Sequence, residues 1–182
     1  MVSWLARFDH ATLEHLTPYR APWLDDLMLA VTDLGGRGFV WVAIALIAFV
    51  IPERRADAWR SLLTILVTFL LVDGMLKPLI WRDRPFDVFP DDVLIAARAT
   101  TSSFPSGHAA SAFAGALATS RLLPGARALW FVLAVLIAYS RLYLGVHFPL
   151  DVLAGAVIGT LCALFVLGGR RAVRTETGFR FR

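Results

Sequence analysis

Cysteine and charge are both scarce in this chain of 182 residues. Cys162 is the only cysteine, which excludes an intrachain disulfide, and because it lies in an apolar run we expect a buried, unreactive thiol. Charged residues make up 18% of the chain against 58% hydrophobic residues. Such a composition is unusual for a soluble globular protein and predicts a membrane protein with several spans.

The sequence also lacks the marks of a secreted or a nucleic-acid-binding protein. Residues 1–20 contain no continuous apolar stretch and no small-residue cleavage site, so we expect no removed signal peptide. The net charge of +4 comes from arginines spread between apolar segments, and the absence of a single basic patch argues against a nucleic-acid partner. The length predicts a single domain over residues 1–182.

Five apolar runs predict spanning helices, over residues 39–51, 61–77, 109–123, 128–144 and 150–167. Residues 1–34 are amphipathic instead, because charged side chains alternate with apolar ones at helical spacing. This pattern is typical of a helix on the membrane surface. Whether residues 21–34, with three aspartates, also cross the membrane stays open. The predicted fold is all-α: a polytopic transmembrane helical bundle of five or six spans (35–168) with an N-terminal amphipathic helix.

Two of the predicted spans are rich in small residues. The run 109–123 contains mainly Ala, Gly and Ser, which permits close helix contacts, so we expect it inside the bundle. In the last span, Gly155 and Gly159 form a contact face of the small-xxx-small type. That face fits packing within one chain or between two copies, so the oligomeric state stays open.

Arginines flank three of the short connections and predict the orientation. The groups are Arg54, Arg55 and Arg60; Arg121 and Arg127; and Arg170, Arg171 and Arg174. By the positive-inside rule these places are cytoplasmic, the C-terminal tail (169–182) included. The opposite side carries basic residues that break the rule, namely Lys77, Arg82, Arg84, Arg98 and Arg141. Binding an anion would account for them.

The turn between the last two spans combines groups that suit phosphate chemistry. It reads Ser-Arg-Leu-Tyr-Leu-Gly-Val-His-Phe-Pro-Leu-Asp from Ser140 to Asp151. Pro149 suits the first turn of a helix, which places the Asp151 carboxylate within reach of the His147 imidazole. A carboxylate that holds one ring nitrogen leaves the other free to attack. Arg141 supplies a planar fork of donors that matches phosphate oxygens.

A second stretch, residues 77–85, brings Lys77, Arg82 and Arg84 to the end of a predicted span. On its own, such a basic loop fits the binding of lipid head groups equally well. Asp73 lies one helical turn before Lys77, so an ion pair between the two is the simplest structural interpretation of both.

A third stretch directly precedes the run 109–123. Ser106 is a good N-cap, and Gly107 lets a ligand approach backbone N–H groups at a helix N-terminus, which is a ready anion site. A cap of this kind is common, and His108 at the opening of the helix is what makes it a candidate for chemistry. The predicted topology places all three stretches on one side of the membrane.

Together the stretches read Lys77-x6-Arg84-Pro85, Pro105-Ser106-Gly107-His108 and Ser140-Arg141-x5-His147-x3-Asp151. This combination resembles the type 2 phosphatidic acid phosphatase (PAP2) family, and the resemblance extends over about residues 24–168. It implies an α-helical bundle, no metal and no cofactor, and hydrolysis through a phosphohistidine intermediate. The haloperoxidases that hold vanadate share this site, and they are soluble.

The resemblance also implies a role for each matched residue. His147 would be the nucleophile, Asp151 would orient it, and His108 would protonate the leaving oxygen. The phosphate would be held by Lys77, Arg84, Ser106, Gly107 and Arg141. Arg82, Ser140 and Asp73 would be supports. Three cations in one site would neutralise charge in phosphoryl transfer as a divalent ion otherwise does.

The function implied is that of a membrane lipid phosphatase or pyrophosphatase, such as a bacterial undecaprenyl-pyrophosphate phosphatase. The substrate would be a polyprenyl pyrophosphate, a phosphatidylglycerophosphate or a phosphatidic acid. The expected location is the plasma membrane, with the site at the extracytoplasmic face. Two alternatives stay open: a haloperoxidase-like enzyme, and a non-catalytic lipid-binding protein of the same fold. The loop 86–103 would gate entry through Asp87, Asp91, Asp92 and Arg98, or these side chains would simply be solvated.

Overall fold

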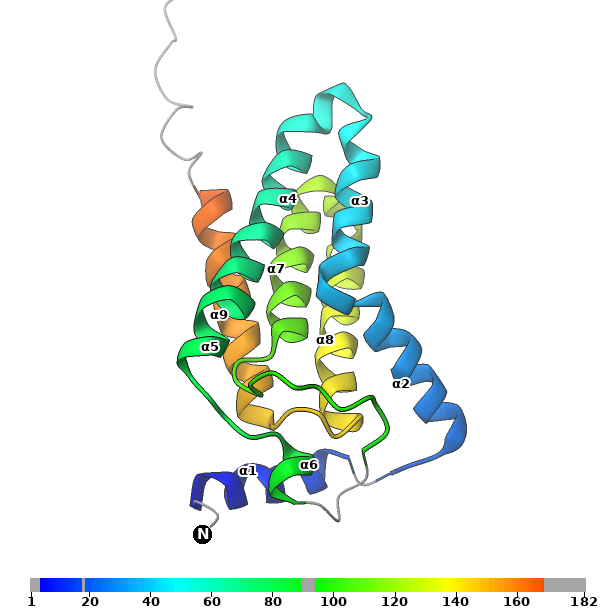
Figure 1. The fold of residues 1–182 in the computed structure, drawn as a ribbon. Helices are drawn as coiled ribbons and strands as arrows, with labels where there is room; N and C mark the ends of the chain where they lie inside the picture. The colour runs from blue at the N-terminus through cyan, green and yellow to red at the C-terminus, as the bar shows by residue number, and fades with distance from the viewer. Residues whose placement is uncertain (1–3, 18, 90–93, 169–182) are drawn as a thin grey trace, which may run out of the picture.

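The computed structural model describes residues 4–17, 19–89 and 94–168, and within these ranges every regular element is a helix (Figure 1). The longer helices are α1 (Trp4–Leu16), α2 (Pro22–Leu34), α3 (Phe39–Phe49), α4 (Arg55–Phe69), α7 (Gly107–Leu122), α8 (Arg127–Tyr143) and α9 (Pro149–Gly168). Two short helices, α5 (Lys77–Leu79) and α6 (Pro85–Val88), lie between α4 and α7, and the π-helical segment η3 (Leu70–Leu76) joins α4 to α5. The all-α prediction is confirmed; the predicted tail 169–182 lies outside the described residues.

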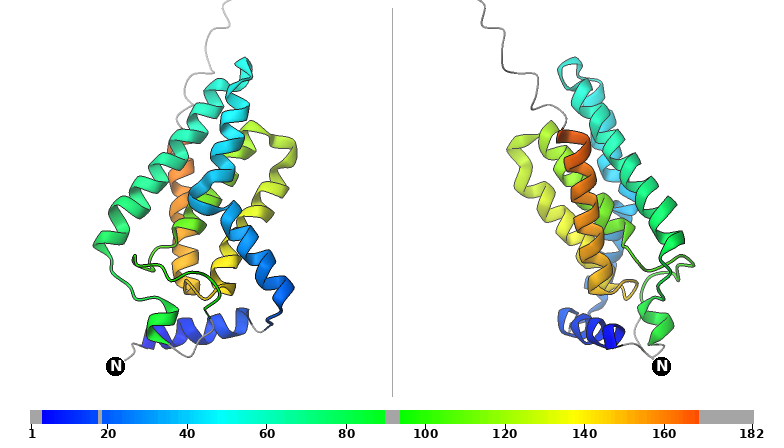
Figure 2. Two further views of the ribbon diagram at one scale, coloured as in Figure 1. Left: turned by 45° about the vertical axis from the view of Figure 1, so that its right-hand side comes forward. Right: turned by 90° about the vertical axis from the view of Figure 1, so that its left-hand side faces the viewer.

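The central helix of the bundle is α7. It contacts α3, α4, α8 and α9, and two further views show these helices around it (Figure 2). Its buried residues are all small except Leu122. Small side chains let the neighbours come close: a Cβ atom added at Gly115 would lie 2.2 Å from the Trp41 ring on α3. The prediction that residues 109–123 lie inside the bundle is therefore confirmed.

Helix α9 packs against α7 through its two glycines. A Cβ atom added at Gly155 would lie 2.3 Å from the carbonyl oxygen of Ser106, and one at Gly159 would lie 2.0 Å from that of Ala110. Real Cβ atoms do not come so close, so only glycine permits this approach. The contact face predicted from these glycines thus joins two helices of one chain.

In the described part of the chain, three helical stretches are long and apolar enough to cross a membrane: Pro52–Leu79, Pro124–Tyr143 and Pro149–Gly168. Helices α2 and α3 together make a fourth candidate, bent by 48° between them. The central helix α7 has 16 residues and lies among these helices. A membrane-spanning bundle is thus supported, while the number of spans, five or six, stays a prediction. In the described part of the predicted 81–104 loop, residues Pro85–Val88 form the short helix α6.

Helix α1 lies across one end of the bundle (Figures 1 and 2). It contacts α8 and α9, buries Leu13 and leaves Trp4 and Phe8 exposed, as expected of an amphipathic helix. One residue departs from that pattern: Asp9 is only 1% exposed. The opposite end of the bundle holds the turns Pro52–Arg54 and Pro124–Ala126 and the last turn of α9.

Candidate active site

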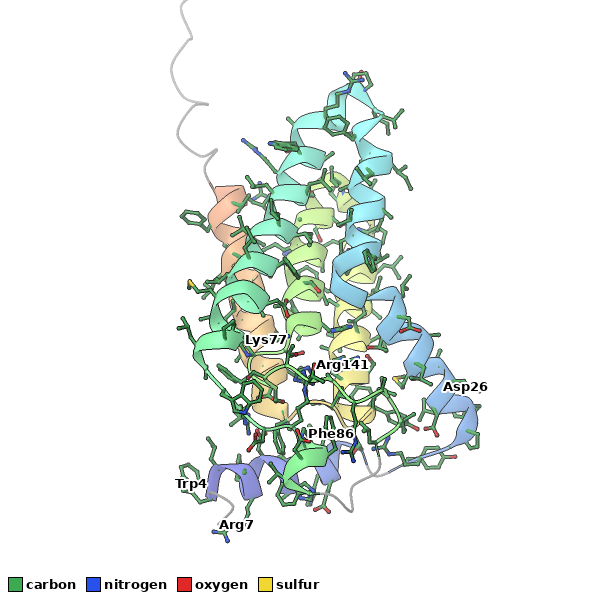
Figure 3. The ribbon with its side chains drawn as sticks, in the orientation of Figure 1. Trp4, Arg7, Asp26, Lys77, Phe86 and Arg141 are labelled. Atoms are coloured by element: carbon green, nitrogen blue, oxygen red, sulfur yellow. The ribbon has the colours of Figure 1, made fainter. Side chains whose placement is uncertain are left out.

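A cavity of about 590 Å³ opens near the end of the bundle that α1 covers. Its walls come from α4, η3, α5, the segment 99–102, the first turn of α7, and α8 with the turn that follows it. Six of the eight predicted site residues line it: Lys77, Arg84, Gly107, His108, Arg141 and His147. Figure 3 shows Lys77 and Arg141 in this region. The three separate stretches of sequence therefore meet in one place, as the predicted topology requires.

His147 lies in the turn between α8 and α9 and is 2% exposed. As predicted, α9 begins at Pro149 and carries Asp151 in its first turn. The His147 Nδ1 atom is 3.6 Å from Asp151 Oδ2, which is longer than a hydrogen bond. A third residue, Ser103, fills the gap: its Oγ atom is 3.4 Å from His147 Nδ1 and 2.5 Å from Asp151 Oδ2.

This geometry selects a tautomer of His147. A hydroxyl has one proton, and at 2.5 Å the Ser103 hydroxyl donates it to the Asp151 carboxylate. Ser103 then has only lone pairs to offer to His147 Nδ1, so Nδ1 carries the imidazole proton. The other ring nitrogen, Nε2, keeps its lone pair. That is the form a nucleophilic histidine needs.

The charge state of His147 also suits a nucleophile. Burial lowers the pKa of His147 to about 3, and the Asp151 carboxylate opposes this only in part. The positive charges of Arg141 and Arg84 lower the pKa further. The imidazole is therefore neutral at neutral pH and able to attack.

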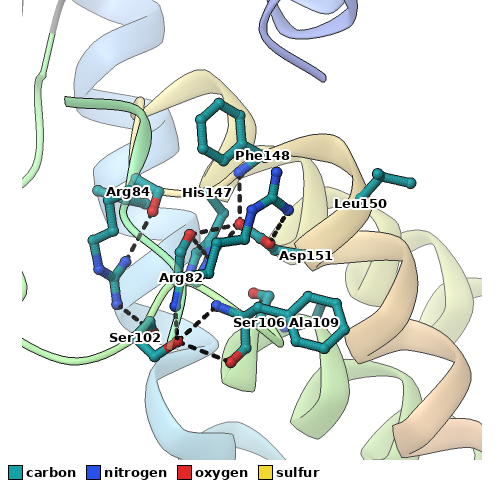
Figure 4. A network of polar contacts seen from close by, with 12 residues as sticks. Arg82, Arg84, Ser102, Ser106, Ala109, His147, Phe148, Leu150 and Asp151 are labelled. Carbon is teal, nitrogen blue, oxygen red and sulfur yellow. Dashed lines mark hydrogen bonds and ion pairs between the residues drawn. The ribbon is translucent and has the colours of Figure 1, made fainter. Parts of the chain in front are cut away.

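Asp151 is fully buried and accepts several hydrogen bonds (Figure 4). Its Oδ2 atom accepts from the Ser103 hydroxyl and, at 2.9 Å, from the Phe148 N–H. Its Oδ1 atom is 2.5 Å from Nη1 of Arg82. The predicted supporting role of Arg82 thus has a concrete form, since it pairs directly with the carboxylate beside His147.

Arg141 is the anion donor that is left incomplete. It is 8% exposed, and it lies on α8 in the wall of the cavity. Nη1 donates to the Thr32 hydroxyl, but the buried Nε has no hydrogen-bond partner among the residues that the structure describes. Buried N–H groups are rarely left unpaired. Arg141 lines the cavity, so an anion bound there would lie beside a guanidinium whose fork of donors matches its oxygens.

Arg84 is, by contrast, largely committed to the protein. Its Nε donates to the Thr101 carbonyl at 3.0 Å, and its Nη1 donates to the Val146 carbonyl at 2.8 Å. Nη2 lies 3.3 Å from both Thr101 Oγ1 and the Ser102 carbonyl. These bonds use four of the five guanidinium donors. Arg84 lines the cavity, but most of its hydrogen bonds connect the segment 101–102 to Val146, in the turn before His147.

Lys77 pairs with Asp73 across one turn, at 2.5 Å between Nζ and Oδ1. The simplest interpretation of these two residues is thus confirmed. The same carboxylate faces the start of α7: a Cβ atom added at Gly107 would lie 2.9 Å from Asp73 Oδ2. Both Lys77 and Asp73 line the cavity, so an entering phosphate meets a lysine that already holds a carboxylate.

Two predicted residues lie behind the cavity wall. The Ser106 hydroxyl caps α7 by accepting from the Ala109 N–H at 3.4 Å, and its contact with phosphate stays a prediction. Ser140 donates to the Ile137 carbonyl at 2.7 Å and is fully buried. Within the described ranges, no group of three or more His, Cys, Asp and Glu side chains is placed to hold a metal ion. Metal-independent hydrolysis stays a prediction.

Sequence reasoning missed Ser103 and Asp9. Ser103 stands two residues before Pro105, so a polar residue next to that stretch was the available signal. Asp9 falls four residues after Leu5 and four before Leu13, on the apolar stripe of α1. A carboxylate in that place indicates a buried partner. Asp91 and Asp92 of the predicted gate lie outside the described residues.

Comparison with known proteins agrees with this geometry. Residues 57–174 match the family described as the PAP2 superfamily. The chain is 33% identical to phosphatidylglycerophosphatase B of Bacillus subtilis over 88% of this chain and 82% of that protein. It is 31% identical to an undecaprenyl-diphosphatase of Sulfolobus acidocaldarius over 75% of this chain, a match that spans 66% of that protein.

A solved structure also shares the fold. The crystal structure of Aquifex aeolicus LpxE superposes with a TM-score of 0.75 at 31% identity, over 87% of this chain and 93% of that chain. The residues matched by the family, 57–174, include the three sequence stretches that meet in the cavity. The chain belongs to the PAP2 superfamily.

Proposed function

We propose that this protein is a membrane phosphatase that hydrolyses a phosphomonoester or pyrophosphate on a lipid, with His147 as the nucleophile. The observation that carries the proposal is the pairing of two groups in one cavity: a neutral imidazole with a free Nε2, and the guanidinium of Arg141. One group attacks phosphorus, and the other binds a phosphoryl oxygen.

In the first step, His147 Nε2 forms a bond to phosphorus while the bond from phosphorus to the leaving oxygen breaks. In the free site, burial and then the charge of Arg141 lower the pKa of His108, at the opening of α7, to about 2. The negative charge of a bound phosphate opposes this shift, so His108 takes up a proton when the substrate binds and gives it to that oxygen, and the lipid alcohol or lipid phosphate leaves in protonated form. The imidazole becomes a positively charged phosphohistidine. Its Nδ1–H remains directed at Ser103 and, through it, at Asp151.

In the second step, water attacks the phosphohistidine. His108, now without its proton, accepts one from the water, and the bond between phosphorus and Nε2 breaks. Inorganic phosphate leaves, His147 is again neutral, and His108 is again protonated. Each proton lost in one step is regained in the other.

The cations of the cavity stabilise the transferring group. Phosphoryl transfer depends mainly on positioning and on charge neutralisation at the equatorial oxygens. Arg141 supplies its free Nε–H, Arg84 the donor it has left, and Lys77 the charge it shares with Asp73. The N–H groups at the start of α7, where Gly107 leaves space, add the positive end of a helix.

The substrate class follows from the family and the names of the relatives. The two relatives are named as acting on undecaprenyl diphosphate and on phosphatidylglycerophosphate. Three candidate spans and the amphipathic α1 support a substrate held in the bilayer. A polyprenyl pyrophosphate, a phosphatidylglycerophosphate or a phosphatidic acid meets both conditions.

The proposed location is the plasma membrane, in a bacterium the inner membrane, with the cavity at the extracytoplasmic face. The support is the distribution of arginines. Arg54 and Arg55 lie at one turn, and Arg121 and Arg127 flank another, at the end of the bundle away from the cavity. The positive-inside rule assigns that end to the cytoplasm.

Phosphate release by purified protein tests the proposal. The assay compares a polyprenyl pyrophosphate, a phosphatidylglycerophosphate and a phosphatidic acid in detergent, with and without a chelator. We expect release from at least one lipid, unaffected by the chelator, and no release by His147→Asn protein of normal thermal stability. Undiminished turnover by that folded variant would disprove the role of His147.

A further inference from the structure

Asp9 is the buried carboxylate of a helix that otherwise lies on the surface. Its neighbours on α1 are exposed, Trp4 by 73% and Phe8 by 62%, whereas Asp9 is 1% exposed. A buried carboxylate is unfavourable unless it is paired and hydrogen-bonded. Burial raises the pKa of Asp9, and its two polar contacts oppose that rise.

Both oxygens of Asp9 reach elements that form the site. Oδ2 lies 2.7 Å from Nη2 of Arg82, and Oδ1 accepts from the Leu150 N–H at 3.1 Å. Leu150 is the second residue of α9, after Pro149, which has no N–H. Asp9 therefore satisfies one of the N–H groups that a helix start leaves unpaired. It does so on the helix whose first turn carries Asp151.

Arg82 connects Asp9 to the catalytic pair. One side of its guanidinium holds Asp9 and the other holds Asp151, at 2.7 Å and 2.5 Å. The guanidinium also stacks over the Phe148 ring, with 4.5 Å from its central carbon to the ring centroid. One cation thus lies between two carboxylates, and its geometry is fixed on both sides.

The net charge of these three side chains affects the stability of the phosphohistidine. Asp9, Arg82 and Asp151 together carry one net negative charge. With Asp9 removed, the positive charge of Arg82 would fully offset Asp151. The phosphohistidine formed on His147 is positively charged, so it is stabilised by the net negative group and not by a neutral pair.

We propose that Asp9 is a positioning residue for the reaction, which acts through Arg82 and the first turn of α9 to keep Asp151 negative and correctly placed beside His147. The inference rests on the proposed function. With this role for Asp9, the amphipathic helix α1 contributes to catalysis, although Asp9 does not line the cavity.

The first test is Asp9→Asn in the full-length purified protein. Asparagine keeps the size of the side chain and an oxygen that can accept from Leu150 N–H, but it removes the charge. We expect kcat to fall about 10- to 100-fold, as for other supporting groups, with KM within about twofold of the wild type. The control is Glu14→Gln on the same helix, whose side chain is 67% exposed and should leave both constants unchanged.

A double-mutant cycle separates charge balance from simple attachment of α1. If Asp9 acts by offsetting Arg82, Asp9→Asn should have little effect, less than about threefold, in protein that already carries Arg82→Gln. An equal loss in both backgrounds, with the Arg82→Gln protein otherwise active, would mean that Asp9 only anchors the helix. That result would overturn the inference.

Two more measurements keep the inference testable if turnover is absent or Asp9→Asn does not fold. Orthovanadate binding needs the same histidine and the same charge balance but no hydrolysis. The Kd for vanadate should therefore rise in Asp9→Asn about as much as kcat falls.

The variant Asp9→Glu keeps the charge, so its kcat should stay within about tenfold of the wild-type value. Wild-type protein that binds vanadate but releases no phosphate would refute the proposed function alone. Unchanged vanadate affinity in Asp9→Asn, or an Asp9→Glu protein as impaired as Arg82→Gln, would refute the role of Asp9.

Discussion

Ser103 donates a hydrogen bond of 2.5 Å to Asp151 and so stands between that carboxylate and the His147 imidazole. The position of Pro149 predicted that Asp151 would reach the imidazole directly, and the 3.6 Å separation shows that a hydroxyl takes part in this contact. The hydroxyl donates to the carboxylate and accepts from the Nδ1–H of His147, so the proton stays on Nδ1 and Nε2 keeps its lone pair.

Replacing Ser103 by Ala should therefore slow the reaction. We expect kcat to fall by about tenfold or more with little change in KM, because a supporting group of the nucleophile is lost. Ser103→Thr keeps the hydroxyl and should retain more activity. Ser120→Ala removes a hydroxyl from α7 that bonds only to the Ala116 carbonyl, and it serves as the control. Equal activity of the Ala and Thr variants at position 103 would contradict a role of the Ser103 hydroxyl between Asp151 and His147.

Arg141→Lys should behave as a severe substitution. A lysine cannot present Nε–H and Nη–H groups together in a plane, so it would lose either the contact to Thr32 or the one to phosphate. We expect kcat/KM to fall about 10²- to 10³-fold in a phosphate-release assay. Arg121→Lys, an exposed residue near the end of α7, provides the matched control. Comparable losses in both variants would exclude a specific role for Arg141.

Asp73→Asn should strengthen the binding of inorganic phosphate. In the structure Lys77 is held by Asp73, which competes with an anion for the same ammonium group. Removing the competing charge should lower the inhibition constant for phosphate by about fivefold, roughly 1 kcal/mol, for a pair whose side chains are 13% and 32% exposed. The measurement is product inhibition at fixed substrate, with Asp57→Asn near the other end of the bundle as the control. Weaker phosphate inhibition would show instead that Asp73 is needed to place Lys77.

His147 should make the folded protein less stable in acid. Its pKa is about 3 when folded and 6.5 ordinarily, so below about pH 6.5 the unfolded chain binds a proton that the folded protein does not. The free energy of unfolding should then fall as the pH drops from about 6.5 toward 3. Tm values at about pH 7.5 and about pH 5 measure the effect, which should be smaller in His147→Asn. An identical drop in both proteins would assign the acid sensitivity to other groups.

Gly159→Ala should destabilise the fold. The added methyl group would lie 2.0 Å from the Ala110 carbonyl oxygen, so α9 and α7 would have to separate. Overpacking of this kind costs about 1–3 kcal/mol. Gly125→Ala has no neighbouring atom within 4 Å and should leave Tm unchanged. A stable Gly159→Ala protein would mean that the helices can move apart without loss.

Local signals in the sequence predicted much of the site. Pro149 marked the start of α9 and Ser106 the cap of α7, because both depend on residues within one helical turn. The small residues of α7 marked the centre of the bundle. Asp73 and Lys77 are neighbours by helical spacing alone.

Contacts between distant segments were beyond that reasoning. The bonds from Arg84 to the Val146 carbonyl and from the Leu150 N–H to the Asp9 carboxylate join residues far apart in the chain, and no local pattern encodes them. They depend on how loops and helix ends are brought together by the whole fold. Arginine suits phosphate and carbonyl oxygens equally, so composition could not separate the free donor of Arg141 from the committed donors of Arg84.

The two glycines of α9 have a consequence for access to the cavity. They press α9 onto the first turns of α7, and the Ser106 N–H bonds to the Asp151 carbonyl at 3.0 Å, so the helices that carry His108 and Asp151 are locked in register. The first turn of α7, which lines the cavity with Gly107 and His108, is therefore held in place by α9 from behind. The cavity also has an outward-facing border, because Phe69 at the end of α4 and Trp81 just after α5 line it and are exposed by 43% and 69%.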